Sequence, residues 1–143
     1  MSTQAPVALE PHLAATVAAL ARTLYPHDAL GDQVYARVPA KIAEAVREDP
    51  AQARMVSEGV ADLDGRGEKP FAERSADERL ADAKAIAGSD FFELVRSTAV
   101  VEVYSDTATW RALGYEGQSF AKGGYLRRGF DDLDWLPDLP QEA

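Results

Sequence analysis

Hydrophobic positions in the first three quarters of the chain recur every three or four residues, which is the spacing of one face of an α-helix. The first such stripe consists of Leu9, Leu13, Val17, Leu20 and Leu24. Alanines, the best helix formers, fill the positions between them. We expect this helix to end at Tyr25, because the residue before a proline is pushed out of the α region.

Capping residues predict where the next two helices begin. A second helix is expected from Asp32 as its N-cap, with an apolar stripe that reaches Val46. Pro39 falls inside it and predicts a kink or a break there. Asp49 followed by Pro50 predicts a third helix, because aspartate caps helices and proline suits the first helical position.

Two capping boxes predict the fourth and fifth helices. Ser75 with Glu78 opens the fourth, which we expect Gly88 to stop. Asp90 with Glu93 opens the fifth. Residues 105–106 then cap a short turn of helix that reaches residue 113.

The character of the sequence changes at Gly114, where helical periodicity stops and glycines become frequent. Aromatic residues now recur at every fifth position from Trp110 to Trp135, a spacing that fits neither a helix nor a strand. This stretch holds six of the twelve aromatic residues of the chain. Since large rings need a surface to bury against, we do not expect a solvated linker here.

These patterns together predict a single all-α domain, in keeping with the length of 143 residues. We expect a flexible N-terminus over residues 1–8 and a compact bundle of about five helices over residues 9–113. A long irregular C-terminal arm, rich in aromatic residues and glycine, is expected over residues 114–143.

The net charge of the chain limits which partners it can bind, and the first residues indicate its location in the cell. The formal net charge is −9 and the pI is about 4.6, so the surface repels phosphate backbones and anionic lipid headgroups. We therefore expect neither nucleic acid nor a membrane as a partner. The longest apolar-rich run, residues 13–21, is far shorter than the ~20 residues that span a bilayer. Because no lysine or arginine precedes this run, we expect no export signal and a cytoplasmic location, or export only while the chain is bound to another protein.

Candidate chemistry is sparse. The chain has no cysteine, and its two histidines, His12 and His27, show no metal-ligand spacing, so we expect both in structural hydrogen bonds. No nucleophile elbow is found, and Gly123 and Gly124 do not follow a strand as a dinucleotide-binding loop would. We therefore expect no catalytic, cofactor-binding or metal-binding residue in this chain.

Glu102 and the acidic cluster near the C-terminus can each be explained in a structural or in a functional way. Glu102 interrupts an apolar run, and we favour a water-facing position over a partly buried, paired carboxylate. The acidic cluster of residues 131–138 is expected to form a solvated rim rather than a calcium or acid–base site. Within that cluster, ion pairs with the two preceding arginines would hold the arm in shape. The residues concerned are Arg127, Arg128, Asp131 and Asp134.

Three blocks of sequence carry a family resemblance. They are residues 24–28 (Leu-Tyr-Pro-His-Asp), residues 91–106, which end in Tyr-Ser-Asp, and residues 110–137, which include Leu-Gly-Tyr-Glu-Gly, Lys-Gly-Gly-Tyr-Leu and Phe-Asp-Asp-Leu-Asp-Trp. By their order and spacing, the chain after about residue 9 resembles the gluconate 2-dehydrogenase subunit 3 family. These proteins are small subunits of heteromeric glucose–methanol–choline-type flavoprotein dehydrogenases. The chain departs from many members in lacking a twin-arginine signal and in having Glu102 and Val103 in place of a Gly-Phe pair.

The resemblance implies an accessory role. It implies that this chain is not an enzyme and binds no cofactor itself, but assists the folding, flavin loading or stability of a large subunit. That large subunit would bind FAD and oxidise sugar or alcohol hydroxyl groups. In this interpretation the arm and its root bind the partner. The expected partner-binding residues are Trp110, Tyr115, Phe120, Gly123, Gly124, Tyr125, Arg127, Arg128, Phe130, Asp131, Asp134 and Trp135.

Two alternatives remain open on the residues alone. The arm could wrap the helices of its own chain, because a buried ring does not reveal whose pocket it occupies. The chain could also be a stand-alone ligand-binding or enzyme domain for a hydroxylated small molecule. Such a domain would use Tyr115, Tyr125 and the aspartates of the arm in a mixed aromatic and polar pocket.

Overall fold

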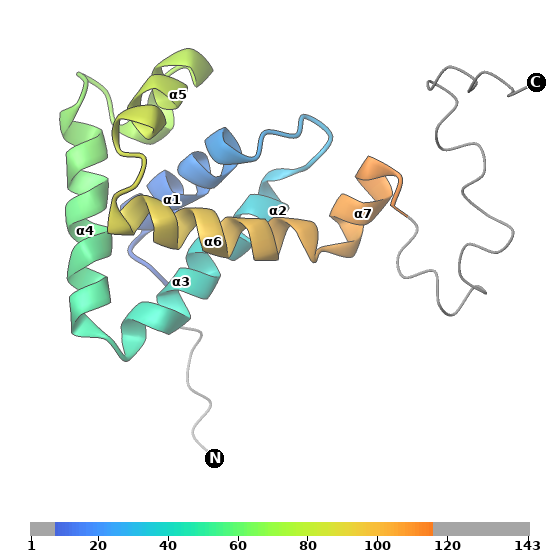
Figure 1. Cartoon of the computed structure of the whole chain (residues 1–143), viewed down its shortest axis with the longest axis horizontal. Helices are drawn as coiled ribbons and strands as arrows, with labels where there is room; N and C mark the ends of the chain where they lie inside the picture. The colour runs from blue at the N-terminus through green and yellow to red at the C-terminus, as the bar shows by residue number, and fades with distance from the viewer. Residues whose placement is uncertain (1–7, 116–143) are drawn as a thin grey trace, which may run out of the picture.

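The computed structural model of the chain describes residues 8–115, and these form helices joined by short loops (Figure 1). No strand occurs in this part of the chain, so the predicted all-α class is confirmed for it. The predicted flexible N-terminus lies almost wholly outside the described residues. The predicted arm beyond Tyr115 also lies outside them.

Within residues 8–115 there are six helices of seven residues or more, one isolated helical turn (α2) and one 3₁₀ turn (η1). In chain order the elements are α1 (Pro11–Leu24), α2 (Asp32–Tyr35), α3 (Arg37–Arg47), α4 (Pro50–Gly65), η1 (Phe71–Glu73), α5 (Ala76–Ala85), α6 (Asp90–Tyr104) and α7 (Thr107–Leu113).

Three of the predicted helix starts are confirmed atom by atom. The Asp49 carboxylate accepts hydrogen bonds from two backbone N–H groups at the start of α4. Ser75 and Glu78 form the reciprocal capping box that opens α5. Asp106 caps α7 by accepting from the N–H of Ala108 at 2.7 Å. Each cap satisfies N–H groups that have no partner inside their own helix.

The second predicted helix is wrong in its start, whereas the break predicted within it is present, three residues before Pro39. Gly31, and not Asp32, is the residue before α2, and the helix breaks at Ala36 to begin again as α3. Pro39 therefore lies in the first turn of α3 and does not kink a long helix. The break is placed there because the first-turn N–H groups need no helical acceptor, so a proline costs little at that point.

The boundary between α5 and α6 also differs from the prediction. Ser89, and not Asp90, caps α6, and its hydroxyl accepts from the N–H of Phe92. Helix α5 ends at Ala85, before Gly88, whose φ of 87° lies in the left-handed region. The glycine thus belongs to the turn between the helices, where a side chain would strain the backbone.

Helix α1 forms the centre of the domain. Its Val17, Leu20 and Ala21 are fully buried, and it packs against α3, α4, α5 and α6. Figure 1 shows α4 standing across one end of α6, while α7 projects beyond the other helices at the opposite end of α6. This opposite end is where residues of the three sequence blocks meet.

Candidate functional site

An aromatic cluster joins the first two sequence blocks at the α7 end of the domain. Tyr25 and His27 lie in the turn after α1, whereas Tyr104 is the last residue of α6. The Tyr104 ring stands edge-on to the Tyr25 ring, with centroids 5.8 Å apart, and to the His27 ring at 5.6 Å. A hydrogen bond of 2.7 Å connects His27 Nε2 with the Tyr104 hydroxyl. The fold thus places two blocks that are distant in sequence in direct contact.

Tyr35, which is buried in the core, holds the backbone of this cluster through two hydrogen bonds. Its hydroxyl donates to the carbonyl of Tyr25 at 2.6 Å and accepts from the N–H of His27 at 3.1 Å, and its ring is buried. Burial raises the pKa of Tyr104, and the neighbouring Tyr25 and Tyr35 raise it further. Tyr104 therefore stays protonated at neutral pH and acts as a hydrogen-bonding group within a packed cluster.

The third block is attached to the same cluster through α7. Trp110 Nε1 donates to the carbonyl of Tyr104 at 2.6 Å. The Trp110 ring meets the Tyr115 ring edge-on, with centroids 5.3 Å apart, and the N–H of Tyr115 donates to the carbonyl of Trp110. Gly114, with φ of 75°, turns the chain at the end of α7 and so allows this approach. Trp110 and Tyr115, the two predicted partner-binding residues that the structure describes, are therefore packed together.

Arg37, which sequence reasoning did not single out, joins α3 to the junction of α6 and α7. Its guanidinium donates to the carboxylates of Asp106 and of Glu102, the latter at 3.3 Å. The prediction that Glu102 faces water is wrong, because its side chain is only 16% exposed. The alternative of a partly buried, paired carboxylate is right, and the pairing group belongs to the same chain. Hydrogen bonds from Arg37 and then from the N–H of Ala108 lower the pKa of Asp106.

Most of the exposed large apolar side chains in residues 8–115 belong to α6 or follow from α7. Of the five large hydrophobic residues that are exposed in the described part of the chain, four lie on α6 or at the end of α7. We call these four residues, Val100, Val101, Leu113 and Tyr115, the α6–α7 face. Single exposed apolar residues are ordinary, but four of five within residues 100–115 make this segment, which leads into the predicted arm, a candidate contact surface.

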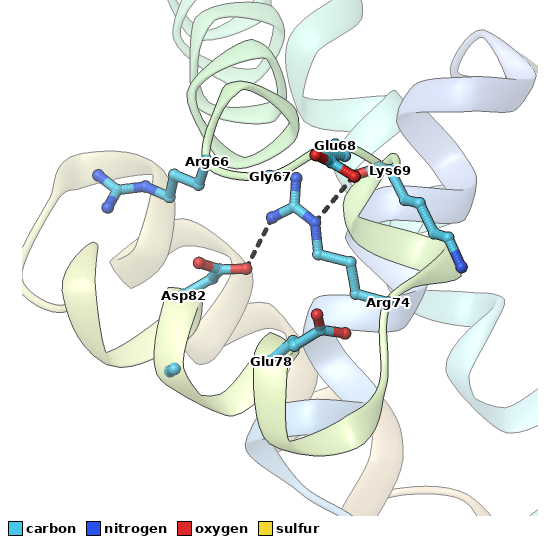
Figure 2. A pocket seen from close by; sticks show the side chains of 8 residues that line it. Arg66, Gly67, Glu68, Lys69, Arg74, Glu78 and Asp82 are labelled. Atoms are coloured by element: carbon cyan, nitrogen blue, oxygen red, sulfur yellow. Dashed lines mark hydrogen bonds and ion pairs between the residues drawn. The ribbon is translucent and has the colours of Figure 1, made fainter.

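A hollow at the α4–α5 end of the domain is lined by charged residues that serve to hold the fold together. It measures about 380 Å³ and lies between α5 and the loop after α4 (Figure 2). Arg74 is 7% exposed there, and it pairs with Asp82 at 2.6 Å. It also donates to the backbone carbonyls of Leu63, Asp64 and Lys69. The central cation of this hollow is therefore engaged within the fold, and it holds the end of α4 to α5.

Both histidines make hydrogen bonds within the fold, as predicted. His12 contacts Asp64 at 2.6 Å, and His27 contacts Tyr104. Over residues 8–115, no three histidine or acidic side chains are grouped so that they could hold a metal ion. In the same range, no helix is both long and apolar enough to cross a membrane.

The other ten predicted partner-binding residues cannot be placed. Phe120 to Trp135 lie outside the described residues. The proposed ion pairs of Arg127 and Arg128 with Asp131 and Asp134 also lie outside them.

Comparison of the chain with protein-family models, with curated proteins and with solved structures found no match. The resemblance to the gluconate 2-dehydrogenase subunit 3 family rests on the sequence blocks alone.

Proposed function

We propose that this chain is a non-catalytic small subunit that docks on a large FAD-dependent sugar or alcohol dehydrogenase subunit and stabilises it. The observation that carries the proposal is the contact between the blocks of the family resemblance. Tyr25 and His27 of the first block, Tyr104 of the second and Trp110 of the third form one connected cluster. Resemblance in separated blocks is expected when the blocks build one site.

The position of this cluster favours docking over catalysis. Through Trp110 it holds the root of the predicted arm, and Val101, Leu113 and Tyr115 of the same segment are each about half exposed. Fully burying a large apolar side chain contributes about 1.5–3 kcal/mol. A few such groups together with aromatic anchors from the arm are enough to dominate the energy of an interface.

In the proposed complex the redox chemistry belongs to the partner. Because the present chain has no glycine-rich dinucleotide motif, we assign FAD to the large subunit. The role of the small subunit is to cover an apolar surface of the large one and thereby to assist its folding and flavin loading. We therefore expect no turnover by the isolated chain.

Truncation tests the proposal. The candidate large subunit is a glucose–methanol–choline-type flavoprotein from the same genome, co-expressed with this chain. We expect the full chain to yield a stoichiometric complex that contains flavin, and a chain truncated after Leu113 to lose assembly. Deletion of residues 2–7 serves as the control and should leave assembly intact.

Two outcomes would contradict the proposal. If the truncated chain assembled fully but the complex bound its substrate with altered affinity, the arm would belong to a substrate pocket. Turnover of a hydroxylated substrate by the isolated chain would show that it is itself an enzyme.

A further inference from the structure

Helix α7 needs support from the rest of the domain. It has only seven residues, and helices shorter than about 12 residues are marginal on their own in water. Figure 1 shows it projecting past the bundle, and the helix it packs against most is α6. Its orientation therefore depends on the few contacts that tie it to its neighbours.

One of these contacts comes from α3, across the domain. Arg37 is the first residue of α3, and its two terminal nitrogens reach Asp106 and Glu102 separately. Asp106 uses one carboxylate oxygen for Arg37 and the other for the N–H of Ala108, so a single side chain both caps α7 and ties it to α3. The second tether is the hydrogen bond from Trp110 to the carbonyl of Tyr104.

Arg37 pairs with two carboxylates in this group, one from α6 and one at the start of α7. Glu102 and Asp106 are four residues apart, and both side chains are less than one-fifth exposed. A carboxylate that is largely withdrawn from water is costly unless a cation pairs with it. The guanidinium of Arg37 pairs with both carboxylates at once, and its planar fork suits such double pairing.

We propose that Arg37 is a positioning residue that fixes the direction in which α7 leaves α6 and thereby holds the α6–α7 face in place. The part of this proposal that assigns the α6–α7 face to docking rests on the proposed function. The part that concerns the effect of Arg37 on α7 does not. Loss of Arg37 should loosen α7 while the bundle stays folded, because Arg37 is partly exposed and its own helix is anchored by the buried Val38 and Ile42.

Hydrogen exchange in the isolated full-length chain tests the effect on α7. The backbone N–H groups to follow are those of Trp110, Gly114 and Tyr115, which are hydrogen-bonded within or just after α7. In Arg37→Gln we expect these amides to exchange about fivefold faster, the factor for a contact worth about 1 kcal/mol. The amides of α4 should not change.

Three further variants separate the ion pairing of Arg37 from the N-capping of α7 by Asp106. Arg47→Gln is the matched control, because Arg47 ends the same helix in an exposed pair with Glu48, and it should leave α7 unchanged. Arg37→Lys keeps the charge without the fork and should rescue part of the effect. Asp106→Asn keeps a good N-cap but loses the charge, so it should loosen α7 as Arg37→Gln does. Equal exchange in the wild type and in Arg37→Gln would overturn the proposal.

Binding to the candidate large subunit tests the docking role. We expect Arg37→Gln to weaken the complex about fivefold and Arg47→Gln to have no effect. Faster exchange in α7 with unchanged affinity would overturn the docking role of Arg37 and leave the proposed function standing. No binding even by the wild type would overturn the proposed function, and the exchange data would still decide whether Arg37 positions α7.

Discussion

Replacement of Arg74 by methionine should destabilise the domain far more than the loss of an exposed arginine would. The guanidinium is buried and donates to the carbonyls of Leu63, Asp64 and Lys69 as well as to Asp82. Methionine fills a similar volume but offers no donor. It would leave one carboxylate without its cation and three carbonyls without this donor.

The magnitude follows from this arrangement. Breaking a buried ion pair by removing one partner costs about 3–5 kcal/mol. The Asp82 side chain is 19% exposed, so water can partly replace the arginine, which favours the lower end of that range. Lost hydrogen bonds to carbonyls add about 1 kcal/mol each where water does not reach them. We expect a total loss of about 4 kcal/mol and a Tm lowered by about 10–15 °C.

Urea and thermal unfolding of the purified variants measure this loss. Arg66→Met is the matched control, because Arg66 forms an exposed pair with Asp62 one helical turn away and should cost only about 0.5 kcal/mol. Arg74→Lys keeps the charge but not the fork, so its loss should lie between the two and remain measurable if Arg74→Met does not fold. A free energy of unfolding for Arg74→Met within 1 kcal/mol of the wild type would refute this reasoning.

Two further predictions concern the packing of α4 and the pH dependence of stability. A Cβ added at Gly59 would lie 2.2 Å from Cγ of the buried Phe91, so Gly59→Ala should cost about 1–3 kcal/mol, whereas Gly65→Ala meets nothing within 4 Å and should be neutral in the same urea assay. The hydrogen bond to Asp64, reinforced by the charge of that residue, raises the pKa of His12. Its stabilising effect should be complete below about pH 6.5 and be lost as the pH rises through the raised pKa. The free energy of unfolding should therefore fall over that range in the wild type more than in His12→Gln, and parallel pH profiles for the two would contradict the assignment.

Local signals predicted much of the fold. Asp49, Ser75 and Asp106 were identified as caps because capping depends only on a polar side chain and the next three residues. The same logic failed at Asp90, where the preceding Ser89 competes for the cap position. It also failed at Gly31, since a glycine cap contributes no side chain that would mark it.

Long-range contacts were not predictable in the same way. Arg37 and Arg74 look like ordinary surface arginines in the sequence, because nothing near them indicates which carboxylates and carbonyls the fold brings to them. Glu102 was expected to face water for the same reason, since its partner is 65 residues away. The contact between His27 and Tyr104 likewise spans 77 residues. The sequence blocks marked both residues as belonging to the site, but only the fold shows that they touch.

The proposed role of this chain, the small subunit of a flavoprotein dehydrogenase, is tested most directly by the composition of the complex purified through a tag on this chain from its native cell. We predict a stoichiometric complex with a large glucose–methanol–choline-type subunit, with bound flavin that is lost when residues 114–143 are deleted. A colourless chain that elutes alone, folds cooperatively and keeps the same Tm with or without the flavoprotein would contradict the claim.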